Sequence, residues 1–127
     1  MNDSSPSPGC VTVYVTMPDR QSAEVFCKTL VTERLAACAN ILDAVASVYW
    51  WQGELETAME CACLFKTTAE RFPAFLERAK EIHPYEVPCI TAWPIIHGHA
   101  PYLDWIRAET GGRHGDAGNG QERESIL

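Results

Sequence analysis

The sequence has no run of about eighteen apolar residues, so no segment of the 127-residue chain is predicted to cross a membrane as a helix. Its start, MNDSSPSPG, lacks the charged and apolar stretches of a secretory signal, and we therefore expect a cytoplasmic protein. Basic residues are scarce, because ten lysines and arginines stand against seventeen acidic residues, a formal net charge of -7. An acidic surface repels nucleic acid, so neither nucleic acid nor membrane is expected as a partner.

The six cysteines include no C-x-x-C pair, which excludes the spacing typical of a zinc ribbon. In a reducing compartment we expect them to be free thiols. Cys61 and Cys63 are two residues apart and would point to the same face of a strand. Two such thiols can chelate a soft metal, but buried packing is the favoured interpretation, since cysteine is among the most buried residue types.

Periodicity in the first half of the chain predicts a strand, a helix and a long hairpin. Alternating valines indicate a strand over Val11–Thr16, and Asp19 is the expected N-cap of an amphipathic helix. A second strand is predicted over Ala39–Trp51, with a bulge or turn at Leu42–Ala44. Gln52-Gly53 then has the composition of a hairpin turn, in which glycine supplies a positive φ.

The returning strand leads to a second amphipathic helix. Thr67 and Glu70 have the spacing of a capping box, and the regular helix is expected to start between Glu70 and Phe72. Pro73 fits the first turn of that helix.

The stretch EIHPYEVP, Glu81–Pro88, is predicted to form a rigid corner after this helix. Pro84 disfavours a helical conformation at His83, so the helix should end near Ile82. Pro88 has no amide hydrogen, so the following strand, predicted over Val87–Ile95, belongs at the edge of a sheet.

After this strand, His97-Gly98-His99 is expected to be a loop, and Pro101 suits the start of a short additional helix that Gly111 ends. The polar composition at the two ends predicts a disordered segment over residues 1–9 and a disordered tail over residues 111–127. The folded domain is therefore expected to span residues 10–110.

The resulting order, β-α-β-β-α-β with one appended helix, predicts an α+β fold of the ferredoxin-like type. Right-handed crossovers give a strand order of 4-1-3-2, with both main helices on one face. The end of the first strand, Thr16 and Met17, should then lie beside His83, Tyr85 and Glu86. One face of the sheet and two edges are left uncovered, so we expect self-association.

Several motifs resemble the CutA family of divalent-cation tolerance proteins. They are RLAACANI (Arg34–Ile41), SVYWWQGELE (Ser47–Glu56), LFKTT (Leu64–Thr68), HPYEVP (His83–Pro88) and YLDWI (Tyr102–Ile106). The resemblance runs from about Val11 to Glu109. It implies a cytoplasmic homotrimer similar to PII-type signalling proteins, which binds copper or another divalent cation and has no established catalytic reaction or organic cofactor.

Some relatives bind copper through a cysteine at the end of the first strand and two consecutive histidines, positions held here by Val15, Ile82 and His83. Only the last position matches. The resemblance and the chemistry of copper nominate a metal site whose residues are His83, Glu86, Met17 and Cys38. Aromatic side chains are nominated for ligand or interface contacts: Tyr49, Trp50, Trp51, Tyr85 and Trp105.

Simpler interpretations stand beside these nominations. His83 at a helix end suits contact with the terminal carbonyl groups, and Cys38, among alanines, suits an unreactive buried thiol. Two other functions on the same topology are less favoured. An acylphosphatase-like hydrolase needs a basic phosphate-binding loop where this chain has Thr16–Asp19, and an RNA-binding module needs more aromatic and basic residues than ECACLFK provides.

Overall fold

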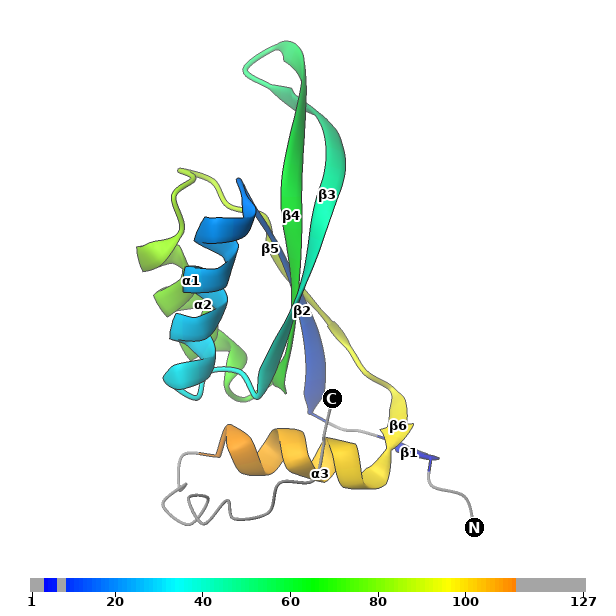
Figure 1. The fold of residues 1–127 in the computed structure, drawn as a ribbon. Coiled ribbons are helices and arrows are strands. Elements are labelled where there is room, and N and C mark those ends of the chain that lie inside the picture. Colours follow the sequence, from blue (N-terminus) through cyan, green and yellow to red (C-terminus); the bar gives the residue numbers. More distant parts are fainter. Residues whose placement is uncertain (1–3, 7–8, 112–127) are drawn as a thin grey trace.

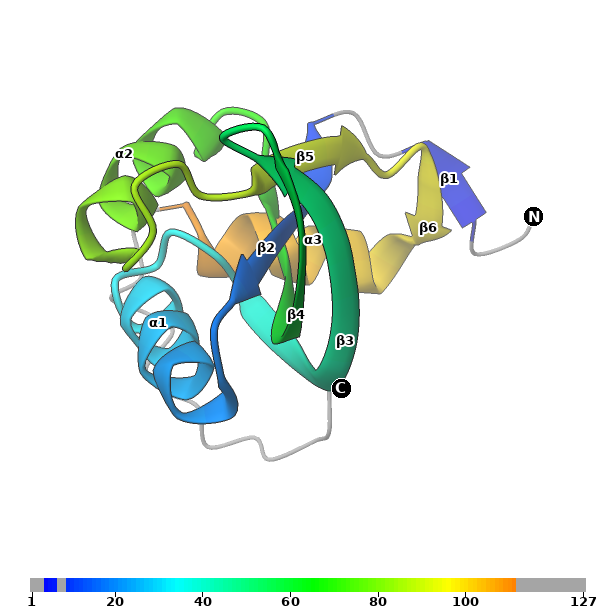
Figure 2. The same cartoon turned by 90° about the horizontal axis from the view of Figure 1, so that it is seen from above.

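The computed structural model describes residues 4–6 and 9–111. The elements, in chain order, are β1 (Ser4–Pro6), β2 (Cys10–Met17), α1 (Arg20–Thr32), β3 (Cys38–Trp51), β4 (Glu54–Thr68), α2 (Phe72–Ile82), β5 (Ile90–Pro94), β6 (His97–His99) and α3 (Ala100–Glu109). Helices α1 and α2 lie together on one side of the main sheet, as Figures 1 and 2 show. The α+β ferredoxin-like fold is thereby confirmed.

The main sheet has the order β3-β4-β2-β5, which confirms the predicted 4-1-3-2 order of the strands within the domain. β2 pairs antiparallel with both β4 and β5. β5 is the predicted edge strand, but it begins at Ile90 rather than Val87. The missing amide hydrogen of Pro88 explains the late start, because a proline cannot donate to the ladder.

The core lies between this sheet and the two helices. Val13 and Val15 of β2, together with Phe65 of β4, point toward the helices and are fully buried. The ring of Phe65 meets those of Phe26 and Phe75 edge-on, with centroid distances of 6.0 and 4.9 Å. These contacts arise because the period of two in the strands and the apolar stripes of the helices meet in one layer.

The local signals for α1 and the hairpin are confirmed. The side chain of Asp19 accepts a hydrogen bond of 2.8 Å from the amide of Ser22, which caps α1. In the hairpin, the register shifts between Leu42 and Val45, and the tip has positive φ at Gln52 and Gly53. The β3–β4 hairpin projects well beyond the two helices (Figure 1).

The predicted capping box of α2 is wrong. Thr67 is fully buried, and its hydroxyl donates to the carbonyl oxygen of Leu35 at 2.8 Å, because burial requires a partner for that hydroxyl. It is the hydroxyl oxygen of Thr68 that accepts a bond from the amide of Arg71, at 3.0 Å. As expected, the helix begins at Phe72 with a proline in its first turn.

The predicted loop at His97–His99 is also wrong, since these residues form β6 and pair with Ser4–Pro6 of β1. Residues 4–6, which fall within the segment 1–9 expected to be disordered, form β1. Polar composition indicates that a segment builds no core, but a strand ladder requires only backbone groups. Residues 1–3, 7–8 and 112–127, also expected to be disordered, lie outside the described residues.

Helix α3 crosses one end of the sheet, opposite the hairpin tip (Figure 1). Its Leu103 and Ile106 pack with Cys10 in a second small core. Two arginines hold its C-terminal end. Arg34 forms an ion pair of 2.6 Å with Glu109, and Arg71 donates two hydrogen bonds, of 2.7 and 3.0 Å, to the carbonyl oxygen of Thr110.

Candidate functional site

The predicted corner begins where α2 ends. The last helical residue is Ile82, and His83 has extended backbone angles, with φ -80° and ψ 137°. The amide of His83 still donates to the carbonyl oxygen of Ala79 at 2.9 Å, so the corner remains attached to the last helical turn. Pro84 follows directly, which is the steric reason for the turn out of the helix.

The imidazole ring of His83 uses both of its nitrogens inside the subunit. Nε2 lies 2.9 Å from the carbonyl oxygen of Thr16, and Nδ1 accepts a hydrogen bond of 3.1 Å from the amide of Tyr85. A carbonyl oxygen only accepts, so Nε2 carries the proton and the ring is neutral. Burial lowers the pKa of His83 below its ordinary value, although the bond to Thr16 opposes this effect.

A second contact joins the corner to the hairpin. The hydroxyl of Tyr85 donates to Oε2 of Glu60 at 2.7 Å, and the hydroxyl of Ser47 donates to Oε1 of the same carboxylate at 2.6 Å. Burial, followed by the bond to Glu60, raises the pKa of Tyr85. Sequence reasoning missed Glu60 and Ser47. The available signal was a carboxylate within a strand whose neighbouring positions, Met59 and Cys61, are apolar.

The four nominated metal residues do not gather in one place within the subunit. Met17 is buried in the main core beside its strand partner Cys61, and Glu86 is exposed on the corner. Cys38 is paired with Lys66 in the half of the sheet near α3, and its sulfur lies 3.5 Å from the hydroxyl of Tyr102. Across the described ranges, 4–6 and 9–111, no group of three or more histidine, cysteine or acidic side chains is arranged to hold a metal ion.

The sequence prediction of proximity at the corner is nevertheless confirmed for Thr16 and His83, which are in direct contact. A copper ion that used the ring of His83 would have to displace Thr16 or Tyr85 from it. The nominated residues of one subunit therefore do not fit a copper ion.

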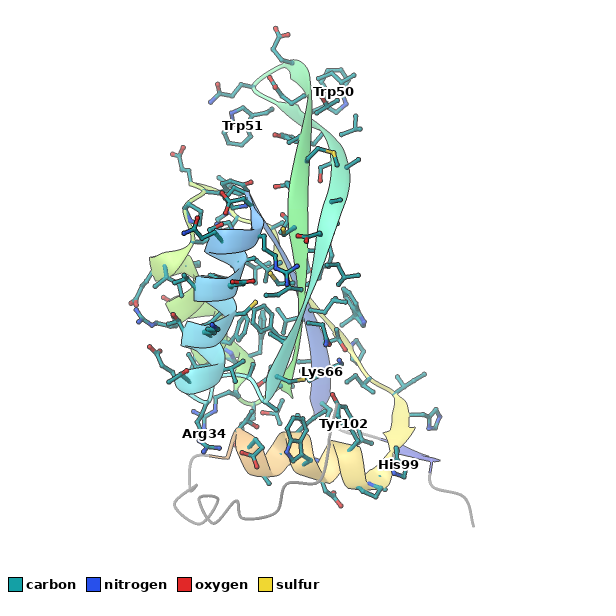
Figure 3. All side chains as sticks on the ribbon, viewed as in Figure 1. Arg34, Trp50, Trp51, Lys66, His99 and Tyr102 are labelled. Carbon is teal, nitrogen blue, oxygen red and sulfur yellow. The ribbon has the colours of Figure 1, made fainter. Side chains whose placement is uncertain are left out.

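The nominated aromatic residues fall into two groups. Tyr49, Trp50 and Trp51 end β3 next to the hairpin turn, and Trp50 is 72% exposed. Figure 3 labels the two tryptophans near the hairpin tip. Trp105 belongs to α3 and stacks on Tyr102 with a centroid distance of 5.5 Å, so it is partly covered by its own subunit. Trp50 and Trp51 thus lie on the projecting part of the hairpin, away from α3 (Figure 3).

None of the helices in the described part of the chain is long and apolar enough to cross a membrane. The fold and the corner together define a ferredoxin-like domain with a projecting hairpin, in which a histidine, a tyrosine and a glutamate connect three elements. The chain belongs to the family of CutA1 divalent ion tolerance proteins, whose model matches residues 11–109.

Similar proteins cover nearly the same residues. The divalent-cation tolerance protein CutA of Thermus thermophilus is 48% identical over 99 residues, which make up 78% of this chain and 96% of the relative. A solved structure of the Thermus protein superposes with a TM-score of 0.78 at 47% identity, covering 80% of this chain and 99% of that one. The Archaeoglobus fulgidus structure, described as a periplasmic divalent cation tolerance protein, has a TM-score of 0.77 at 39% identity, covering 80% and 98%.

Proposed function

We propose that this chain acts in the tolerance of divalent cations as a homotrimeric binding protein that catalyses no reaction. The proposed assembly rests on one observation, namely that the hairpin exposes a group of large apolar side chains beyond the body of the subunit. These residues are Val48, Tyr49, Trp50, Trp51, Leu55 and Met59.

Two physical arguments support self-association. A two-stranded hairpin is marginally stable by itself in water, so one that projects this far needs a surface to pack on. In addition, β3 and β5 are the edges of the main sheet and present backbone groups to a neighbouring strand. Copies of the same chain satisfy both needs in a closed symmetric ring, and the three-subunit form follows from the resemblance to CutA and PII-type proteins.

Copper or another divalent cation is the proposed ligand, on the strength of the family's name and of the relatives' names. Both nitrogens of His83 have partners, so we place the ion among groups that assembly brings together rather than on this ring. The exposed carboxylate of Glu86 is available for such a site. A cytoplasmic location agrees with the six free thiols, because a reducing compartment preserves them.

One observation favours a second candidate, a PII-like signalling or protein-anchoring trimer that binds a small ligand without specific metal binding. The corner holds Tyr85 and Glu60 in a short hydrogen bond beside the exposed hairpin, an arrangement suited to a polar organic molecule.

Sedimentation equilibrium at micromolar concentration tests the assembly. We expect a mass of three subunits, and a monomer would refute the proposal. Calorimetric titration of the assembled protein with a panel of divalent cations and nucleotides separates the two candidates. Saturable binding of a cation supports the first, whereas saturable binding of a nucleotide with no cation binding supports the second.

A further inference from the structure

A polar hollow lies between the end of β4, the start of α2 and the end of α3, away from the corner described above. Its volume is about 430 Å³, and two of the side chains that line it are the arginines Arg71 and Arg107. Glu70 supplies the one carboxylate among the described residues that line the hollow. The lining therefore has a net positive charge, in a chain whose formal net charge is -7.

The contact that attaches α3 also orients the guanidinium of Arg71. Nε and Nη2 both donate to the carbonyl oxygen of Thr110, at 3.0 and 2.7 Å, which uses two of the five N–H groups that a guanidinium carries. The N–H groups of Nη1 and the second one of Nη2 form another fork, and such a fork matches two oxygen atoms of a phosphate group. Arg71 is thus held in position on one edge while its other edge keeps hydrogen-bond donors.

Arg107 has a partner that engages only a small part of its side chain. Its Nη1 donates to Oδ1 of Asp104 at 3.1 Å, within α3. The Asp104 side chain is 77% exposed, and exposed ion pairs contribute little to stability. This contact uses one of the five N–H groups of the guanidinium. Arg107 therefore keeps donors for a ligand in the hollow.

The charge of these donors selects the kind of ligand. Two guanidinium groups offer two positive charges, and a phosphomonoester carries a charge of about -1.5 to -2 at pH 7. A carboxylate matches the charge of only one guanidinium, and metal cations are repelled by both. The volume of the hollow falls within the range of small-molecule sites, roughly 300–1,000 Å³, so it can also receive an organic group attached to the phosphate.

We propose that Arg71 and Arg107 form a binding site for a phosphate group, carried by a small phosphomonoester or by free inorganic phosphate. Thr68 also lines the hollow, and its hydroxyl oxygen accepts a hydrogen bond of 3.0 Å from the amide of Arg71. A hydroxyl both accepts and donates, so its hydrogen is a further donor for the phosphate group. The negative charge of Glu70 opposes binding. The site goes beyond the proposed role in cation tolerance, and it rests neither on trimer formation nor on the corner.

Inorganic phosphate and glycerol 3-phosphate are the probes, titrated separately into the full, assembled protein in a phosphate-free buffer of low ionic strength. Isothermal titration should show saturable binding at one site per subunit. Tighter binding of glycerol 3-phosphate identifies a phosphomonoester as the ligand, and equal or tighter binding of inorganic phosphate identifies the free ion. If neither probe binds saturably at millimolar concentrations, the proposal is overturned.

Matched variants test which side chains hold the phosphate group. Arg107→Gln should weaken binding by about tenfold or more, because it removes charge-assisted hydrogen bonds. Glu70→Gln should strengthen binding, because it removes the opposing charge. Arg20→Gln is the control, since it removes the same charge from an exposed arginine of α1 that does not line the hollow, and it should leave the affinity nearly unchanged.

Arg71→Lys keeps the positive charge but replaces the fork with an ammonium group, so it should also weaken binding. Because Arg71 also attaches α3, circular dichroism must show that this variant is folded, and Arg107→Gln decides the question if it is not. Equal weakening by Arg107→Gln and Arg20→Gln would show that the probes respond only to net charge, and would refute the site. Glycerol 3-phosphate has no nucleobase and is not a cation, so failure here leaves the trimer and both candidate functions standing.

Discussion

His83 and Thr16 are joined by a hydrogen bond of 2.9 Å between the imidazole Nε2 and the backbone carbonyl oxygen. This bond connects the end of α2 to the end of β2, two elements that are far apart along the chain. The other ring nitrogen accepts a hydrogen bond from the amide of Tyr85, so a single side chain holds the corner next to the end of β2. The ring acts as a structural connector in its neutral form.

A first prediction concerns pH. The folded-state pKa of His83 is lowered below 6.5, so below that pH the unfolded chain binds more protons than the folded one. The stabilisation by the neutral ring is present above pH 6.5 and is lost as the pH falls through the folded-state value. Urea unfolding between pH 4.5 and pH 8 should therefore show a decrease toward acid that is weaker in His83→Gln. Equal pH dependence in the two proteins would contradict a lowered pKa.

The second prediction is that His83 does not bind copper. Since both ring nitrogens have partners, His83→Gln should keep the copper stoichiometry and affinity of the original chain. Isothermal titration of both proteins checks this, after circular dichroism has confirmed that the variant is folded. A tenfold loss of affinity in the variant would show that the ring releases Thr16 or Tyr85 and binds the ion.

The third prediction tests the hairpin as the assembly surface. Trp50→Glu replaces an indole that is 72% exposed in the subunit, and burial of a side chain of this size is worth about 2 kcal/mol. The dissociation constant of the trimer should therefore rise roughly thirtyfold for each indole that no longer packs in the assembly. Val25→Glu is the matched control, because Val25 is 63% exposed but lies on α1. Equal weakening by both substitutions would contradict assembly through the hairpin.

The fourth prediction concerns the attachment of α3. Arg71→Ala removes two hydrogen bonds to the carbonyl oxygen of Thr110 and should lower the free energy of unfolding by about 1.5–3 kcal/mol. Arg107→Ala removes an exposed pair with Asp104 and should cost less than about 0.5 kcal/mol. Chemical denaturation at one fixed protein concentration measures both variants. If the two variants lost similar amounts of unfolding free energy, the hydrogen bonds from Arg71 to Thr110 would contribute no more than an exposed ion pair.

The sequence was sufficient for features whose causes are local. The cap at Asp19, the positive φ at the Gln52-Gly53 turn and the end of α2 before Pro84 each depend on a few adjacent residues. The strand order also followed, because handedness and the order of elements leave few arrangements. The edge position of β5 agrees with Pro88 before the strand and Pro94 at its end, because proline has no amide hydrogen to donate to a neighbouring strand.

Contacts between distant residues needed the tertiary structure. The spacing of Thr67 and Glu70 is typical of a capping box. In the structure Thr67 is buried, and its hydroxyl donates a hydrogen bond to the carbonyl oxygen of Leu35 instead. The bond from Tyr85 to Glu60 joins residues that are 25 positions apart in the sequence and belong to different parts of the fold.

By itself, the sequence determined the ferredoxin-like order of elements and the family, since both rest on periodicity and on motifs read along the chain. Only the tertiary structure decided that both ring nitrogens of His83 have partners, Thr16 and Tyr85, and that the hydroxyl of Tyr85 donates to Glu60. The physical reason is that a side chain's chemistry depends on its partners and its exposure to water, which are properties of packing in three dimensions.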